Sequence, residues 1–265
     1  MRRSEWNEQA DAFESEVCDI ADEEIGDELK QLVAVVRPSP RTSVLVDLGC
    51  GLGSFILKFG NRFQQVYALD FADRILARAK QRCAGMPRIE WLAMDMGRAA
   101  ERIGPIADLL VCLNVITSPS VARRNLLWAN VSACTRPGGH ALIVVPSIES
   151  HTMVETRASR RPGHTTILPD ADGVVLREET PQKHYTEEEL VSTGERHGFR
   201  LKRVVRVPYP WSTEGMRKPR GTDAGSPWDW AYLGQKTQGT QSSRAASKAV
   251  DKAGARKRAA NPAGS

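Results

Sequence analysis

The sequence predicts an α/β protein with a doubly wound, mostly parallel seven-stranded sheet, an antiparallel C-terminal strand and helices on both faces. Short apolar runs rich in Val, Ile and Leu alternate with helical patterns over residues 43–147, as in parallel strands joined by helices. A turn with three glycines follows the first run. The last two apolar runs have no helical pattern between them, so we expect them to pair as antiparallel neighbours.

Five parallel strands are expected in the first part of the chain, because each apolar run is continuous, as in strands buried on both faces. They are residues 43–49, 65–70, 89–95, 107–114 and 140–147. Helical patterns separate them at residues 54–62, 73–84, 97–103 and 120–135, and the sequence RPGG stops the last pattern.

The regular alternation ends after the fifth strand. Residues 147–183 predict a less regular insertion on the substrate side, with one strand candidate at 173–179. Thr186 and Glu189 then have the spacing of a capping box, and Gly198 ends the helix that they begin. The two strands of the expected antiparallel pair follow at residues 201–210 and 228–236.

The length of 265 residues and the hydrophobic content of 41% suit one domain, which we place at residues 1–236. Residues 237–265 hold six basic residues and one acidic residue, and so account for the whole net charge of +5. This composition, without any aromatic residue, predicts a disordered basic tail. Such a tail is either a solubilising extension or a weak electrostatic contact to nucleic acid or an acidic partner.

The composition also bears on location. No apolar run approaches the roughly 18 residues of a membrane span, and the first 16 residues turn acidic where a signal peptide needs its apolar stretch. The five cysteines never form a C-x-x-C pair, which disfavours a disulfide framework or a zinc site. We therefore expect a cytoplasmic protein without a membrane partner.

The glycine-rich turn lies in the sequence VLVDLGCGLGSF, residues 44–55. A glycine-rich turn between a strand and a helix usually holds a nucleotide, because backbone N–H groups and the helix N-terminus can meet an anion there. A P-loop would need a lysine and a hydroxyl residue that are not placed correctly here. A dinucleotide fold would need a third glycine at position 54, where this chain has Ser54; that alternative is weakened and stays open.

An acid at the strand end followed by LGCGLG resembles the first motif of the class I (Rossmann-like) S-adenosylmethionine-dependent methyltransferases, and the resemblance extends from about Trp6 to Lys236. The resemblance implies S-adenosyl-L-methionine as the cofactor. It places these loop residues beside the cofactor: Gly49, Cys50, Gly51 and Gly53. Cys50 is most simply a small residue that fills the loop.

Acidic residues stand at the ends of the first three strands. Asp47 can accept hydrogen bonds from the loop N–H groups or from the ammonium of the cofactor. Asp70 lies where a carboxylate binds both ribose hydroxyls, and we expect little structural purpose for it. In the family, the acid at the position of Asp95 commonly contacts the adenine amino group, but Asp95 can equally cap the following helix. Met96, beside it, suits the core or the adenine wall.

Asn114 ends the fourth strand, where the resemblance implies contact with the cofactor and a catalytic role through positioning. Methyltransferases acting on base amines usually carry Pro-Pro and an aromatic residue at this point, and cytosine C5 enzymes a Pro-Cys loop; here VITSPS follows. Asn114 is neutral, and the stretch VPSIESHT at the end of the fifth strand has only one carboxylate, Glu149, so we expect no metal. The favoured function is methyl transfer to an O or N atom of a small molecule. The alternatives are a protein or tRNA methyltransferase and a non-catalytic interaction module.

Residues 1–36 resemble the lid helix of small-molecule methyltransferases, with Trp6 and Phe13 on an apolar stripe, or form an ordinary packing helix. His151 is the best-placed imidazole for a general base, although we expect a solvated loop position for it. Because a sulfonium already activates its methyl group, we expect catalysis mainly by proximity and orientation.

Overall fold

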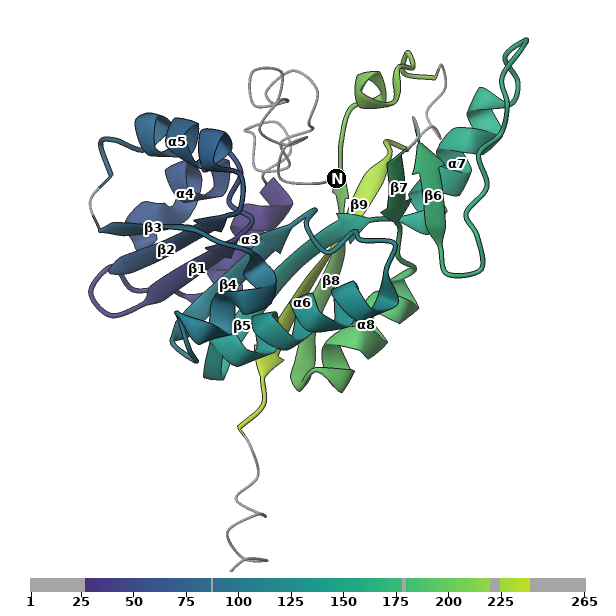
Figure 1. Cartoon of the computed structure of the whole chain (residues 1–265). Helices are drawn as coiled ribbons and strands as arrows, with labels where there is room; N and C mark the ends of the chain where they lie inside the picture. The colour runs from purple at the N-terminus through teal and green to yellow at the C-terminus, as the bar shows by residue number, and fades with distance from the viewer. Residues whose placement is uncertain (1–26, 87, 178–179, 220–224, 239–265) are drawn as a thin grey trace, which may run out of the picture.

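A computed structural model of the 265-residue chain describes residues 27–86, 88–177, 180–219 and 225–238. Its centre is a seven-stranded sheet with the order β3-β2-β1-β4-β5-β9-β8 (Figure 1). Strands β1 to β5 are parallel, and β9 is antiparallel to both β5 and β8. The predicted fold class is confirmed. The strands are β1 Val44–Leu48, β2 Gln65–Asp70, β3 Ile89–Ala93, β4 Ala107–Leu113, β5 Thr135–Pro146, β8 Phe199–Pro208 and β9 Trp228–Lys236.

The strand order reverses beside β1, because the chain builds outward through β2 and β3 and then returns to place β4 on the other side of β1. In open α/β sheets, ligands bind at the carboxyl ends of the strands next to such a reversal. The residues that follow β1, β2 and β4 therefore surround the expected binding site.

Helices cover both faces of the sheet, and a hydrophobic cluster lies beneath each layer. On one face Leu29 of α3 packs in the same cluster as Leu109 of β4. On the other face Trp128 of α6 and Leu190 of α8 pack with strand residues. The first layer contains α3 Asp27–Val36, α4 Ser54–Phe59 and α5 Asp73–Arg82; the second contains η3 Met96–Glu101, α6 Val121–Cys134 and α8 Glu187–Arg196. Besides η3, there are two further short 3-10 helices among the described residues, η2 Gly60–Arg62 and η4 Trp211–Glu214.

The insertion at residues 147–183 is more regular than expected, and that prediction is wrong. It contains an 11-residue helix, α7 Ile148–Ala158, and a hairpin of strands β6 Val174–Arg177 and β7 Thr180–Lys183. The hairpin includes the one strand candidate that the sequence indicated, but its second strand and the helix were missed.

Helix α7 escapes pattern-based prediction because its buried face is largely polar. Ser150, His151 and Glu155 are all buried on it, so the helix lacks a clear apolar period. A local signal is nevertheless present at its start, where the Oγ atom of Ser147 accepts a hydrogen bond from Ser150 N at 3.0 Å. A serine in that position is a typical helix N-cap.

The ends of the described chain bear on the predicted lid and tail. Trp6 and Phe13 lie outside the described residues, whereas α3 is a packing helix with Leu29 and Leu32 in the core. Thr237 donates hydrogen bonds from N and Oγ1 to Gly198 O, so the domain extends past residue 236. The predicted tail beyond residue 238 is outside the described residues. Within the described ranges, no helix is long and apolar enough to cross a membrane.

Candidate active site

Backbone hydrogen bonds to β2 hold the loop after β1. Gly49 N and Cys50 N both donate to Leu69 O at 2.8 Å. Gly49 has a φ of 78°, and a Cβ atom there would lie 2.5 Å from Cγ2 of Val115. Glycine is therefore required by conformation and by the close approach of the segment after β4. Two further loop residues, Gly51 and Gly53, also have positive φ.

Asp70, at the end of β2, joins two backbone groups. Its Oδ2 accepts a hydrogen bond from Gly51 N at 3.1 Å, and its Oδ1 accepts one from Ala72 N at 2.9 Å. The expectation that Asp70 has little structural purpose is wrong, because these bonds fix the loop and the start of α5. Burial raises the pKa of Asp70, and the backbone N–H groups oppose that rise. Each carboxylate oxygen can accept more than one hydrogen bond, so the two backbone contacts still leave acceptor sites for the ribose hydroxyls. Ribose binding stays a prediction.

Asp47 is almost completely buried in β1, with 2% of its surface exposed. The N–H groups of Gly49 and Cys50 go to Leu69 O, and that of Gly51 goes to Asp70. These three N–H groups thus have other acceptors, and the contact of Asp47 with the loop or with the cofactor stays a prediction. Burial, followed by the charges of Asp47 and Asp70, raises the pKa of the Cys50 thiol. A neutral, buried thiol fits the interpretation of Cys50 as a residue that fills the loop.

Asp95 caps the 3-10 helix η3. Its Oδ1 accepts hydrogen bonds from Gly97 N at 2.6 Å and from the Arg123 guanidinium at 2.5 Å. Burial pushes the pKa of Asp95 up, but these two bonds and the charge of Arg123 outweigh it and hold the pKa below its ordinary value. Met96 is 6% exposed and belongs to the core cluster under α6. The structure thus shows the capping role of Asp95 and the core position of Met96, and adenine contact stays a prediction.

Asn114 lies directly after β4 and has a φ of 55°, a left-handed conformation that is uncommon outside glycine. Its Nδ2 donates a hydrogen bond to Asp229 Oδ2 at 2.9 Å. Asp229 lies near the start of β9 and pairs in register with Pro146 at the end of β5. The two side chains therefore meet at the carboxyl edge of the parallel strands, although 115 residues separate them.

Asp229 is a site residue that the sequence reasoning missed. It is 6% exposed; burial raises its pKa to about 6, the hydrogen bond from Asn114 opposes this rise, and the charge of Glu214 adds to it. The available signal was an acid between two tryptophans in the apolar strand WDWAYL. Burying a charged side chain in an apolar strand costs free energy unless the charge is paired or hydrogen-bonded, so such a residue points to a specific contact.

His151 is on helix α7 and 7% exposed, so the expectation of a solvated loop position is wrong. Its Nε2 lies 2.9 Å from Ile167 O, and its ring is 5.2 Å from the ring of His184 in an edge-on arrangement. A carbonyl can only accept, so Nε2 carries the proton in this bond. The geometry gives His151 a packing role and leaves Nδ1 as its basic nitrogen when the ring is neutral.

Glu149 is engaged in structural hydrogen bonds. Its Oε2 accepts from Trp230 Nε1 and from Ser147 Oγ, both at 2.9 Å. Burial raises the pKa of Glu149, but these bonds outweigh it and leave the pKa below its ordinary value. The carboxylate thus joins the start of α7 to β9.

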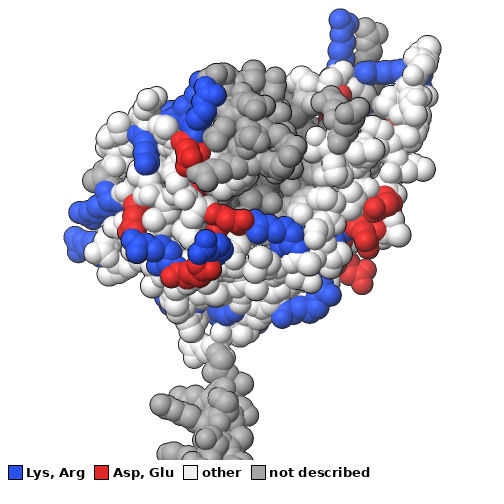
Figure 2. Space-filling model, in the orientation of Figure 1, with Lys and Arg blue, Asp and Glu red and all other residues white. Residues whose placement is uncertain are grey.

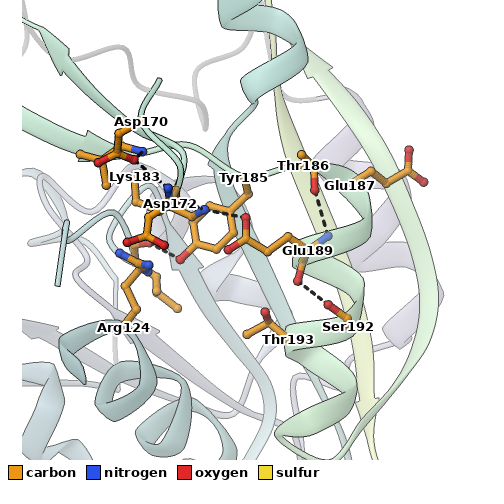
Figure 3. A network of polar contacts seen from close by, with 12 residues as sticks. Arg124, Asp170, Asp172, Lys183, Tyr185, Thr186, Glu187, Glu189, Ser192 and Thr193 are labelled. Atoms are coloured by element: carbon orange, nitrogen blue, oxygen red, sulfur yellow. Dashed lines mark hydrogen bonds and ion pairs between the residues drawn. The ribbon is translucent and has the colours of Figure 1, made fainter. Parts of the chain in front are cut away.

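A buried lysine fastens the insertion to α8 (Figure 3). Lys183 Nζ donates to Glu189 Oε2 and to Asp172 O, each at 2.6 Å. Thr186 Oγ1 accepts a hydrogen bond from Glu189 N at 3.1 Å, so the helix begins as predicted. The Glu189 side chain, however, binds Lys183 rather than completing a capping box.

Charges of both signs are mixed over the face of the molecule drawn in Figure 2. Surface ion pairs such as Arg98–Glu101, at 2.7 Å, balance some of them. A mixed surface produces no broad field of one sign. The described part of this face therefore offers no extended basic patch for a polyanion.

The reversed strand order, the glycine loop after β1 and the acid after β2 define a Rossmann-like fold of the class I methyltransferase type. The family model described as a methyltransferase domain matches residues 45–139, which contain the loop, Asp70, Asp95 and Asn114. Residues 45–139 therefore belong to a class I S-adenosylmethionine-dependent methyltransferase domain.

Individual relatives agree with this assignment. The chain is 30% identical over 146 residues to the trans-aconitate 2-methyltransferase of Acidovorax sp. (strain JS42), which covers 53% of each protein. It thus spans about half the length of the curated relatives it matches.

Two solved structures share the fold. The 1,6-didemethyltoxoflavin-N1-methyltransferase of Burkholderia thailandensis, with bound S-adenosylhomocysteine, has a TM-score of 0.57 and 17% identity and covers 89% of this chain and 87% of its own. The N-methyltransferase NodS of Bradyrhizobium japonicum WM9 has a TM-score of 0.53 and 15% identity and covers 82% and 99%.

Proposed function

We propose that this protein transfers a methyl group from S-adenosylmethionine to an O or N atom of a small molecule. The observation that carries the proposal is the joint between the first two strands, where Asp70 accepts a hydrogen bond from Gly51 N in the glycine loop. This joint lies beside the reversal of strand order, where ligands bind in such sheets. The methyltransferase family match over the same residues supports the choice of cofactor.

The residues present fit the cofactor. At Gly49 a side chain would collide with Val115, so the loop has only backbone where it meets the segment after β4. The loop of residues 49–53 and Asn114 would hold the amino-acid end of the cofactor. Asp70 would hold the ribose hydroxyls. When bound, S-adenosylmethionine supplies a methyl group that its sulfonium already activates.

The side chains would then act chiefly by binding and orientation. Asn114 is fixed by Asp229 at 2.9 Å, and a rigid group of this kind can hold an acceptor in line with the methyl group and away from water. A general base is needed only where the acceptor loses a proton during attack. His151 is hydrogen-bonded to Ile167 O, which favours a supporting role for it.

The small size of the acceptor is supported by the relatives and by the surroundings of the site. The relatives named above act on trans-aconitate and on 1,6-didemethyltoxoflavin. Two buried tryptophans lie here: Trp211 in η4, between β8 and β9, and Trp228 at the start of β9. Helix α7 is joined to β9 through Ser150, whose Oγ accepts a hydrogen bond from Trp228 N. Apolar walls with a few polar groups are typical of small-molecule sites.

Two measurements test the proposal. Calorimetry with S-adenosylhomocysteine should show binding, and tighter binding of NADH would contradict the cofactor assignment. Incubation with tritiated S-adenosylmethionine and fractionated cell extract should then place the label in the small-molecule fraction. Label in RNA or protein would contradict the proposed acceptor class, and cofactor binding without any transfer would point to a non-catalytic module.

A further inference from the structure

The contact between Asn114 and Asp229 fixes which end of the asparagine amide faces away from β9. Nδ2 donates to the Asp229 carboxylate, and a carboxylate only accepts hydrogen bonds from an amide. The carbonyl oxygen, Oδ1, must then point elsewhere. It is buried and has no hydrogen-bond partner among the described residues. A buried acceptor without a partner is unfavourable, and in a crevice this arrangement suits a ligand that donates a hydrogen bond.

The position of this oxygen follows from the order of the strands. Asp70 ends β2, the glycine loop follows β1, and Asn114 follows β4, the next strand across. Neighbouring strands are about 4.8 Å apart, so β2 and β4 are separated by about 10 Å. A ligand whose ribose lies at Asp70 can therefore extend across the loop to Asn114. The amino-acid end of S-adenosylmethionine carries an ammonium, which supplies both N–H donors and a positive charge.

The surroundings of Asp229 match a positive ligand group. Its register partners on β5 and β8, Pro146 and Val207, are uncharged. Glu214 of η4 adds a negative charge, and the neighbouring Tyr209 hydroxyl is engaged with Glu214 at 2.7 Å. Within the described residues, no cationic side chain pairs with Asp229. Among the described residues, the charge of Asp229 is thus left for a ligand to balance.

We propose that Asp229 is a positioning residue for the cofactor: it holds Asn114 with Oδ1 toward the crevice and supplies the negative charge that attracts the ammonium on the amino-acid end of the cofactor. The inference rests on the proposed function and adds a residue of β9, outside the region that the family model matches. Because the pKa of Asp229 is raised to about 6, this attraction is present above that pH and is lost as the carboxylate is protonated.

The experiment compares two probes by calorimetry from pH 5 to pH 8. S-Adenosylhomocysteine has the amino-acid end, and 5′-methylthioadenosine has the same adenosine and thioether without it. For the unaltered protein, the affinity for S-adenosylhomocysteine should fall about tenfold as the pH drops through 6, while that for 5′-methylthioadenosine stays constant. Asp229→Asn should bind S-adenosylhomocysteine about tenfold or more weakly at pH 8, without the pH dependence, and bind 5′-methylthioadenosine normally.

Two further variants separate positioning from general damage. Asp229→Glu should restore part of the affinity and the pH dependence, and Glu101→Gln, which removes an exposed carboxylate on η3, should leave the affinity at pH 8 unchanged. Identical affinities and pH profiles for Asp229→Asn and the unaltered protein would overturn the inference. Failure of the unaltered protein to bind either probe would instead overturn the proposed function. If Asp229→Asn does not fold, the difference between the two probes across pH in the unaltered protein decides the question.

Discussion

The two halves of the candidate site are built differently. On the β1–β2 side, the loop and Asp70 are joined mainly by backbone groups from residues close in sequence; Gly51 and Asp70 are 19 residues apart. On the β4–β9 side, side chains from distant segments meet: Asn114 with Asp229 over 115 residues, and Glu149 with Trp230 over 81. The first half is a local motif, and the second half exists only when the sheet has assembled.

This difference matters for what each half can do. A backbone-built loop depends on glycines and tolerates few changes, so it suits a cofactor that is common to many enzymes. Side chains brought together from distant segments can change independently of one another, so the residues that position the same cofactor in this half can differ from one enzyme to another. The predictions that follow test this contrast, beginning with the largest expected effect.

Gly49→Ala should damage the backbone-built half most. The left-handed φ and the collision with Val115 together should cost about 2 to 5 kcal/mol of unfolding free energy and abolish binding of S-adenosylhomocysteine. Urea denaturation and calorimetry measure the two effects. Gly104→Ala is the matched control, because Gly104 has a φ of 66° and open space around it, so only conformational strain remains. Equal losses in the two variants would show that the contact with Val115 is unimportant.

Asp70→Asn should weaken binding of S-adenosylhomocysteine by about 1.5 to 3 kcal/mol, the range for a hydrogen bond to a charged group. Asparagine retains one acceptor for Gly51 N or Ala72 N, so the fold should survive. Calorimetry on the folded variant measures the effect, with the exposed Glu101→Gln as a control for loss of charge. An affinity equal to that of the control would remove Asp70 from the ribose site.

Asp229→Asn should stabilise the cofactor-free protein at pH 7. The pKa of Asp229 is about 6 in the folded state and about 3.9 when unfolded. Between these values only the folded state binds the proton, so stability falls as the pH rises from about 4 to 6. Above pH 6 the ionised carboxylate lowers the free energy of unfolding by about 2 to 3 kcal/mol, and Asp229→Asn removes this loss.

Urea denaturation at pH 4 and pH 7 measures whether Asp229→Asn raises the free energy of unfolding at pH 7, as expected. Glu149→Gln is a control of opposite sign, since the pKa of Glu149 is lowered and its carboxylate stabilises the fold at neutral pH. An Asp229→Asn variant that is less stable than the unaltered protein at pH 7 would mean that the carboxylate is well solvated or compensated.

His151→Ala should affect stability more than chemistry. Loss of the ring leaves Ile167 O without its partner, at a cost of about 1 to 3 kcal/mol, while turnover should fall by less than the roughly 10²-fold expected for loss of a general base. Denaturation and, with an identified acceptor, steady-state rates across pH measure both. A larger fall in rate, with loss of an ionisation near pH 6.5, would establish base catalysis.

Truncation after residue 238 should have the smallest effect. Thr237 is the last residue with a hydrogen bond to the domain among those described, so the melting temperature and the affinity for S-adenosylhomocysteine should be unchanged. A shorter protein ending at Lys236 is the matched comparison, because it also loses the two bonds to Gly198 O. A clear loss of stability in the longer protein would assign a structural role to the tail.

The sequence by itself determined the fold class, the glycine loop and the positions of Asp47, Asp70, Asp95 and Asn114 at strand ends. It could do so because apolar runs and glycine turns act over a few residues, and parallel strands bring their carboxyl ends to one edge. Only the tertiary structure decided that Asp70 braces the loop, that His151 is buried on α7, and that Asp229 holds Asn114. Those contacts depend on which strands become neighbours, and a pairing across 115 residues leaves no periodic trace in a single sequence.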